Sequence, residues 1–345
     1  MLSNGRALWQ QIVGGIVMSS RRIRKTQQGE MSTLVLENEK VRVVVAPELG
    51  ARILSLIYKP TETDFAWHSP DAALKKPMRE LDNVSGFFDC IPTTDPCTFR
   101  GRALPEGGEV SSVPWRILKT EQTRRITRIR AEAKCKIYPF LIRKQISLGR
   151  NSSVLTLEHE LRNLSDEPVE YHYSSHNTLR VTPHDRIVLP HEVSKVKLGY
   201  AGQFGKMGDE ITWPECVDGK GDRADVGKIR DPCGKTTENL YTPRLKERWS
   251  ALINEARQEA IGFRFEGDAI PYILICTNNT GWRNYYFAAI EPVSGRPDNL
   301  DVAVNQWKDY ATLRPKTKVN WKQTIILAHN IKRIEKIEND EIIQN

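Results

Sequence analysis

The stretch Val154-Leu-Thr-Leu-Glu-His-Glu-Leu-Arg162 alternates between two kinds of side chain. Three leucines and His159 occupy the odd positions, whereas Thr156, Glu158, Glu160 and Arg162 occupy even positions. Because successive side chains of a β-strand point to opposite faces, this period of two predicts a strand with one buried and one solvated face. His159 lies among the leucines, so we expect it to be a hydrogen-bonded core histidine.

The same alternation recurs along the chain, in Val41–Ala46, Arg52–Tyr58, Ile126–Ile137, Leu141–Leu148, Val169–Val181, Ile270–Thr277 and Val319–Leu327. Turn residues separate these runs, as in Asn-Leu-Ser-Asp-Glu-Pro at 163–168. Short strands joined by hairpins predict an all-β fold built from antiparallel sheets. Residues 241–260 fit either one helix or a hairpin around Asn254-Glu255. Residues 199–240, rich in Gly, Asp, Lys and Pro, are expected to form a long irregular insertion.

The two ends of the chain differ in composition from the middle. Residues 1–30 contain the basic run Arg21-Arg-Ile-Arg-Lys25, which is typical of a solvated tail, and a strand-like segment starts at Met31. We therefore interpret 1–30 as an N-terminal extension outside the core. Residues 31–333 are expected to form a single β-sandwich domain, and 334–345 a charged tail that frays.

Composition limits the classes of protein to which the chain can belong. Its 345 residues fit one large domain or two ordinary ones, and the formal net charge is +8, from 51 Lys and Arg against 43 Asp and Glu. Basic residues are spread among acidic ones, which argues against a nucleic-acid partner. No run approaches the ~20 apolar residues of a membrane span. We expect a cytoplasmic protein with no membrane partner.

Six cysteines occur without any Cys-x-x-Cys pair, so the sequence predicts no zinc site and no metal. Two of them lie in strand-like runs and are expected to be small core residues, Cys135 and Cys276. The other four lie in loop-like runs, namely Cys90, Cys97, Cys216 and Cys233. Reduced, unlinked thiols are the simplest interpretation. A metal or disulfide pairing among these four stays open.

Two titratable residues stand in distinctive contexts, His176 and Glu291. Parity on the run 169–181 places His172, Ser174 and His176 on one face of a strand, where they either line a pocket or lie on an exposed surface. Glu291 follows Ile290 and precedes Pro292, at the end of an apolar strand. Desolvation there would raise the pKa of the carboxyl and make it a better base.

A third segment supplies groups that suit a carbohydrate. Trp282-Arg283-Asn284 combines an aromatic face with planar hydrogen-bond donors. Aromatic rings stack on the apolar face of a pyranose, and donors take its hydroxyl groups. A carboxylate and an imidazole that face such a pocket can move protons in opposite directions, which is the chemistry that opens and recloses a sugar ring.

Four stretches together resemble the aldose 1-epimerase (galactose mutarotase-like) family, over residues from about 33 to 328. Val43-Val-Val-Ala-Pro-Glu-Leu-Gly-Ala-Arg-Ile-Leu-Ser-Leu56 resembles its N-terminal strand–Gly–strand signature. Gly86-Phe-Phe-Asp-Cys-Ile-Pro92 is similar to its early Gly-rich segment. Tyr138-Pro-Phe with Arg143-Lys-Gln-Ile-Ser-Leu148 resembles the strand pair before the acid histidine. The run from Glu291-Pro to Pro297-Asp298 resembles the segment that holds the base.

The resemblance implies a β-supersandwich with a pocket on its concave face and no cofactor. It implies that His176 is the acid that protonates the ring oxygen and that Glu291 is the base that takes the anomeric hydroxyl proton. His172, Asp89, Trp282 and Arg283 are the expected substrate-binding residues, Asp89 as one possibility for the family's hydroxyl-binding aspartate. One departure is that Gly107 stands where the family often has a substrate-orienting histidine.

Three functions remain open on these grounds. The first is cofactor-free interconversion of sugar anomers by acid/base ring opening and closure. The second is a carbohydrate-binding or regulatory protein without turnover, which the loss at Gly107 favours. The third is a related enzyme such as a phosphosugar epimerase, with which the net charge of +8 is compatible. Each implies a small-molecule sugar or sugar derivative as the partner, and the sequence does not indicate which sugar or which oligomeric state.

Overall fold

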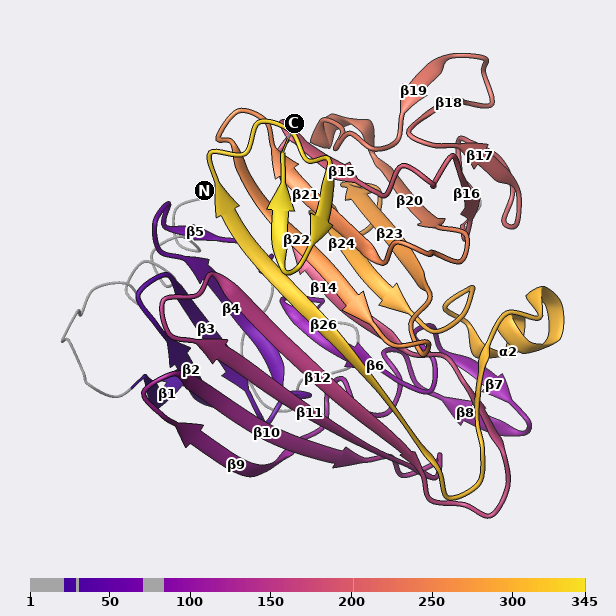
Figure 1. Ribbon diagram of the computed structural model, residues 1–345. Coiled ribbons are helices and arrows are strands. Elements are labelled where there is room, and N and C mark those ends of the chain that lie inside the picture. The colour runs from indigo at the N-terminus through magenta and orange to yellow at the C-terminus, as the bar shows by residue number, and fades with distance from the viewer. Residues whose placement is uncertain (1–21, 29–30, 71–83, 201, 345) are drawn as a thin grey trace.

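Two large antiparallel sheets account for most of the computed structural model, which describes residues 22–28, 31–70, 84–200 and 202–344 (Figure 1). The all-β prediction is confirmed. The larger sheet has 12 strands. In spatial order they are β1 (Ile23–Gln28), β2 (Met31–Glu37), β3 (Val41–Ala46), β4 (Arg52–Tyr58), β6 (Phe87–Cys90), β14 (Ser174–Leu179), β24 (Tyr286–Val293), β23 (Tyr272–Asn279), β20 (Thr236–Tyr241), β16 (Lys195–Leu198) and β17 (Glu210–Thr212), with β5 (Thr63–Asp64) paired to β4.

The smaller sheet has eight strands and packs against the larger one. Its spatial order is β15 (Asp185–Val188), β21 (Trp249–Asn254), β22 (Glu259–Glu266), β26 (Lys318–His329), β12 (Val154–Asn163), β11 (Phe140–Gly149), β10 (Ile126–Lys134) and β9 (Arg116–Gln122). Strand β12 contains the alternating run, and its Leu155, Leu157 and Leu161 are buried whereas Glu158 is exposed. One apolar core fills the space between the sheets.

Short elements lie outside these two sheets. They are β7 (Cys97–Phe99) with β8 (Arg102–Leu104), β13 (Val169–Tyr171) with β25 (Ala311–Leu313), β18 (Glu215–Val217) with β19 (Arg223–Asp225), β27 (Lys336–Glu338) with β28 (Glu341–Ile343), the 3₁₀ turn η1 (Pro232–Gly234), the helical turn α2 (Leu300–Val302) and the π-helical turn η2 (Ala303–Trp307).

The predicted strand Val169–Val181 is in fact two strands. The backbone N–H of His172 donates to the carbonyl of Pro92, and that of Tyr173 donates to Ser294 Oγ, so neither residue continues a ladder. After this break the chain enters the larger sheet as β14. There Ser174 and His176 face away from the core, whereas the Ser175 hydroxyl is 2.8 Å from Oε1 of Gln323 on the opposing sheet.

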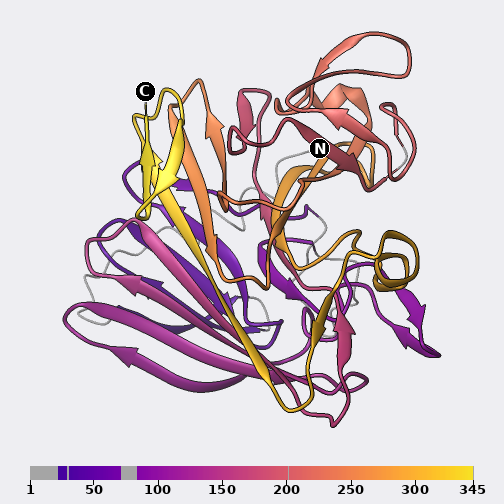
Figure 2. The ribbon, with the colours of Figure 1, turned by 45° about the vertical axis from the view of Figure 1, so that its right-hand side comes forward.

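The described residues before Met31 and the segment after Ile331 both contain β-strands that composition did not predict. Residues 1–21 lie outside the described residues, but β1 pairs with β2 along its whole length, from Ile23 opposite Leu36 to Gln28 opposite Met31. The predicted boundary at Met31 is therefore too late. At the other end, β27 and β28 form a hairpin against β21, β22 and β26 (Figure 2), and Ile334 and Ile337 are buried there. The prediction of a fraying tail is wrong for this hairpin, because its isoleucines cover an apolar patch.

Two ambiguous segments also have defined structures. Residues 241–260 contain the hairpin β21–β22 with its turn at Asn254 to Glu259, and not a helix. The segment 199–240 is irregular in part, but its last residues form β20, an inner strand of the larger sheet. Periodicity did not reveal β20 because Thr236, Thr237, Glu238 and Asn239 are polar. Thr237 and Asn239 line a pocket on one face of the sheet, whereas Glu238 points to the other face, where it pairs with Arg230.

Candidate active site

A pocket of about 380 Å³ lies on the face of the larger sheet that points away from the core. Strands β4, β6, β14, β20, β23 and β24 form its floor, and loops supply its rim. Its described lining includes Arg52, Phe88, Cys90, Asp95, Glu106, Gly107, His176, Asn239, Cys276, Trp282, Arg283, Glu291 and Asp298. Because β14 and β24 are neighbours in the sheet, residues more than a hundred positions apart in sequence meet here.

His176 and Glu291 meet in this pocket. Nε2 of His176 is 3.5 Å from Oε1 of Glu291, and the second carboxyl oxygen of Glu291 is hydrogen-bonded to the Ser174 hydroxyl. The Glu291 side chain is 1% exposed and that of His176 is 13% exposed. One edge of the imidazole therefore reaches the cavity, and the almost fully buried carboxyl lies beside it.

Burial perturbs the acidity of both groups in the direction that disfavours charge. It lowers the pKa of His176 to about 4. It raises the pKa of Glu291 well above the ordinary value, and the negative charge of Asp298 adds to the increase while the Ser174 hydrogen bond opposes it. The imidazole is thus neutral near pH 7, and the carboxyl retains its proton to a higher pH than an exposed glutamate does.

An aromatic and cationic stack holds the imidazole in place. The His176 ring lies parallel to Phe88, with centroids 4.5 Å apart and planes inclined by 13°. The guanidinium of Arg52 covers the same phenyl ring at 3.9 Å from its centroid and donates to the carbonyls of Ser85 and Ser111. Sequence reasoning did not single out Arg52 as a pocket residue, although it lies in the quoted run 43–56. Its position on β4 next to β6 was the missing information.

Three further carboxyl groups line the pocket, those of Asp95, Glu106 and Asp298. Asp298 is 5% exposed, and its Oδ1 accepts no hydrogen bond from the described residues, although Nε2 of His172 is 3.3 Å away. Asp95 lies at the rim. Partial withdrawal from bulk water, together with the negative charges of Asp298 and Glu106, raises the pKa of Asp95. Sequence reasoning did not predict this cluster of acids, because Asp95, Glu106 and Asp298 come from three separate loops.

The expected substrate-binding residues have different outcomes. Trp282 and Arg283 line the pocket, and the Arg283 guanidinium is 4.9 Å from the centroid of the indole. His172 does not line it: its side chain is fully buried behind Asp298, because the strand breaks before β14. The expectation that His172 contacts a sugar, which was based on the alternation of side chains along the strand, is therefore corrected.

Asp89 also lies away from the pocket. It is on β6 between two pocket residues, so its side chain points into the core between the sheets. There Oδ2 accepts from Lys144 Nζ at 2.7 Å and Oδ1 accepts from the Tyr173 hydroxyl at 2.7 Å. Nε2 of His159 is 3.0 Å from the same Oδ1, which gives this core histidine a polar neighbour. The expectation that Asp89 contacts a sugar is corrected to a buried structural ion pair.

Gly107 lines the pocket, at the position where the resemblance implied a missing histidine. Its φ is +71°, in the region that favours glycine, and its N–H donates to the carbonyl of Thr94. A Cβ atom built on this backbone would lie 2.5 Å from Ser111 Oγ. A histidine at this position would therefore need both a different loop conformation and a shift of Ser111.

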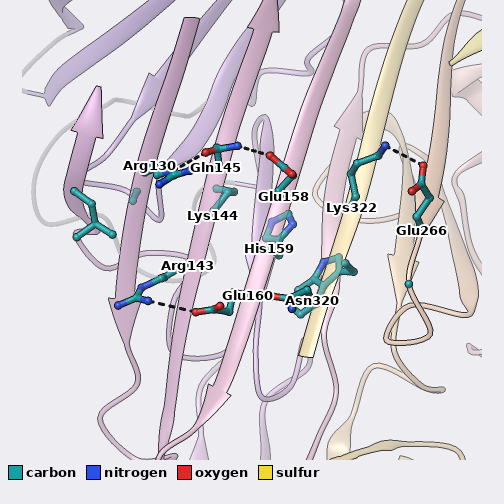
Figure 3. A pocket seen from close by; sticks show the side chains of 14 residues that line it. Arg130, Arg143, Lys144, Gln145, Glu158, His159, Glu160, Glu266, Asn320 and Lys322 are labelled. Carbon is teal, nitrogen blue, oxygen red and sulfur yellow. Dashed lines mark hydrogen bonds and ion pairs between the residues drawn. The ribbon is translucent and has the colours of Figure 1, made fainter. Parts of the chain in front are cut away.

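A second hollow, of about 610 Å³, lies on the outer face of the smaller sheet (Figure 3). Its charged side chains are largely paired across strands. Arg130 donates to Gln145, Gln145 donates to Glu158, and the other pairs are Arg143 with Glu160 and Lys322 with Glu266. Mutual pairing leaves this hollow without the convergent groups that the pocket on the larger sheet has.

Neither a metal centre nor a disulfide is evident in the described part of the chain. No group of three or more His, Cys, Asp or Glu side chains there has a geometry suited to a metal ion. All six cysteines are free thiols, and Cys90, expected in a loop, is a buried residue of β6. Among the described residues, no helix has the length and apolar character that crossing a membrane requires.

The comparisons with known proteins give the fold. No family model and no curated protein matches the sequence. Solved structures do match: a galactose mutarotase related enzyme from Lactobacillus acidophilus has a TM-score of 0.61 at 13% identity, with 87% of this chain and 99% of that chain covered. A galactose mutarotase-like protein from Lactobacillus casei has a TM-score of 0.61 at 15% identity, with 86% and 100% covered.

A galactose mutarotase-like protein from Clostridium acetobutylicum also matches, with a TM-score of 0.62 at 11% identity and 89% and 98% of the two chains covered. The chain therefore has the galactose mutarotase-like β-sandwich fold, as the sequence resemblance predicted. At these identities the likeness establishes the architecture alone.

Proposed function

We propose that this protein is an aldose 1-epimerase-like enzyme that interconverts the anomers of a sugar. The observation that carries the proposal is the His176–Glu291 pair, with 3.5 Å between Nε2 and Oε1 at the floor of a pocket large enough for a monosaccharide. Ring opening requires one group to take the anomeric hydroxyl proton while another protonates the ring oxygen. Two neighbouring groups that share one proton can do both.

The reaction conserves protons at every step. One group removes the proton from the hydroxyl on C1, the electrons of that O–H bond form the carbonyl, and the bond from C1 to the ring oxygen breaks as the second group protonates that oxygen. The open-chain aldehyde rotates about its C1–C2 bond. The ring then closes on the other face of the carbonyl, both protons return, and the enzyme recovers its starting state without a redox change.

The rest of the pocket supports a sugar as the ligand. Trp282 offers an aromatic face, and Arg283 and Asn239 offer polar groups around the same cavity. The fold is shared with proteins described as galactose mutarotase-like. This likeness favours a sugar over an unrelated metabolite of the same size.

A second candidate, a sugar-binding protein without turnover, is favoured by one observation. Gly107 lines the pocket without a side chain, so one donor that would orient a substrate is absent. The retained acid/base pair argues against it, because a binding protein has no need for a proton-sharing pair. The third candidate, a phosphosugar epimerase, would require cations that outweigh the carboxyl groups of Asp95, Glu106, Glu291 and Asp298.

The direct test is an anomerisation assay. Freshly dissolved α-anomers of a panel of neutral, amino and phosphorylated sugars are followed by polarimetry or by exchange NMR, with and without protein. Acceleration above the buffer rate that is lost in Glu291→Gln supports the enzyme. Saturable binding without acceleration for the same sugars supports the binding protein instead.

A further inference from the structure

The hydroxyl of Thr178, on the same face of β14 as His176, has two polar neighbours and a single hydrogen. Oγ1 is 2.7 Å from the carbonyl oxygen of Val84 and 3.0 Å from Nδ1 of His176. A carbonyl oxygen can only accept, so the hydrogen of the hydroxyl must point to Val84. Thr178 is fully buried, so a water molecule cannot replace Val84 or His176 as its hydrogen-bond partner unless that residue moves away.

The lone pair of the hydroxyl therefore faces the imidazole. Two facing lone pairs at 3.0 Å would repel, so Nδ1 of His176 has to carry a hydrogen and donate it to Thr178. In a neutral imidazole the other nitrogen, Nε2, is then unprotonated. Nε2 is the atom that faces Oε1 of Glu291.

Burial keeps the imidazole neutral. It lowers the pKa of His176 most, the charge of Asp298 in the loop after β24 opposes it and Arg52 on β4 adds to the decrease, so that the pKa falls to about 4. Burial also raises the pKa of Glu291 on β24, whose carboxyl lies beside Nε2. The two groups therefore titrate as a pair.

We propose that Thr178 is a positioning residue that holds His176 with a hydrogen on Nδ1, so that Nε2, beside Glu291, is the nitrogen that exchanges a proton with the sugar. The inference rests on the proposed anomerase function. In ring opening, one member of the His176–Glu291 pair takes the proton from the anomeric hydroxyl, and the other gives a proton to the ring oxygen as the bond from C1 to that oxygen breaks. Ring closure returns both protons.

The resting state is tested first, without any substrate. In protein with ¹⁵N-labelled histidine, the His176 signals, assigned with a His176→Asn variant, are recorded between pH 5 and pH 8. A neutral ring with the hydrogen on Nδ1 is expected throughout. An imidazolium at pH 7, or a neutral ring with its hydrogen on Nε2, would overturn the proposal whether or not the protein anomerises any sugar.

The role of the hydroxyl is tested with two substitutions. Thr178→Val keeps the shape and removes the hydroxyl, so we expect a mixture of tautomers in the ¹⁵N spectrum. By analogy with the partners that orient metal-bound imidazoles, we expect kcat to fall by roughly 10- to 100-fold, with little change in KM. Thr178→Ser restores the hydroxyl and should recover the wild-type tautomer and pH profile.

Thr127→Val is the matched control. Thr127 is equally buried, and its hydroxyl donates to the carbonyl of Leu148 in the smaller sheet, away from the pocket. It should leave the tautomer and the pH profile unchanged. An unchanged His176 tautomer in Thr178→Val, or an equal effect of Thr127→Val, contradicts the positioning role. If the protein shows the expected tautomer but anomerises no sugar, the proposed function and the role of Nε2 in proton exchange are both refuted. The positioning of the ring by Thr178 then still stands.

Discussion

Glu291 is almost without solvent contact, yet its carboxyl reaches both Ser174 and His176. Glu291→Gln keeps the size of the side chain and can still bond to Ser174, but an amide cannot exchange a proton with a sugar oxygen. We expect a loss of anomerisation of about 10²- to 10⁴-fold with an unchanged fold. Polarimetry measures the rate and circular dichroism the fold. A variant within about threefold of the wild type would refute the role of Glu291, and Glu158→Gln on the other sheet is the control.

The pH dependence follows from the perturbed acidities of the same pair. The pair is active while it holds one proton. Below about pH 4, the pKa of His176, the imidazole is also protonated, so the pair can no longer take a proton from the sugar. Above the raised pKa of Glu291 the carboxyl also loses its proton, so the pair can no longer give one. We expect a bell-shaped kcat/KM profile whose acid limb lies near pH 4 and whose alkaline limb lies above the range of an ordinary glutamate. A rate still rising through pH 9 would contradict this assignment.

At the scale of elements, the C-terminal hairpin β27–β28 closes the outer face of β21 and β22. Ile337 packs into the space above Gly262, where a Cβ atom would come within 2.6 Å of its terminal methyl group. Ile337→Ala removes buried methyl groups and should lower the free energy of unfolding by about 2–5 kcal/mol. Chemical denaturation measures this, with exposed Glu341→Ala as the control. Equal stability of the two variants would show that the hairpin is dispensable.

Strand β1 gives the second prediction at this scale. It pairs with β2 along six residues, and Arg24 forms an ion pair with Glu37. A chain that begins at Met31 loses these bonds and exposes the edge of β2. We expect its thermal midpoint to fall by at least about 2 °C, the lower end of the shift that 1 kcal/mol produces in a domain of 150–250 residues. A chain that begins at Arg22 is the matched comparison, and identical midpoints for both chains would contradict the contribution of β1.

For the molecule as a whole, the positive net charge does not extend to the pocket. The chain carries +8, but the described pocket lining holds four carboxyl groups and two guanidinium groups, and the pKa values of Glu291 and Asp95 are raised, so the lining has no excess of positive charge near pH 7. We expect a sugar phosphate to bind no more tightly than its neutral parent at low ionic strength, because no surplus cation is available to pair with the phosphate. Calorimetric titration of both ligands measures it. Tighter binding of the phosphate would revive the phosphosugar alternative.

Much of this architecture could be predicted from local patterns. Strands β3, β4 and β12 repeat with period two because each has one face on the core, and that pattern is a property of neighbouring residues. His176 and Glu291 could be selected because a titratable side chain is unusual beside apolar strand residues. Strand β20 was hidden, since its pocket-facing residues are polar and its periodicity therefore resembles a loop.

The sequence by itself determined the all-β class, the likeness to mutarotases, and the two residues that meet in the pocket, because alternation and local context are recorded along the chain. Only the tertiary structure decided which strand residues face the pocket. It showed that His172, at the break before β14, and Asp89, within the four-residue strand β6, point away from the pocket, whereas Arg52 lines it. It also decided the acid/base properties of the His176–Glu291 pair. Burial, the Thr178 hydroxyl and the charge of Asp298 set these properties, and these groups come together only when β14, β24 and their loops are side by side.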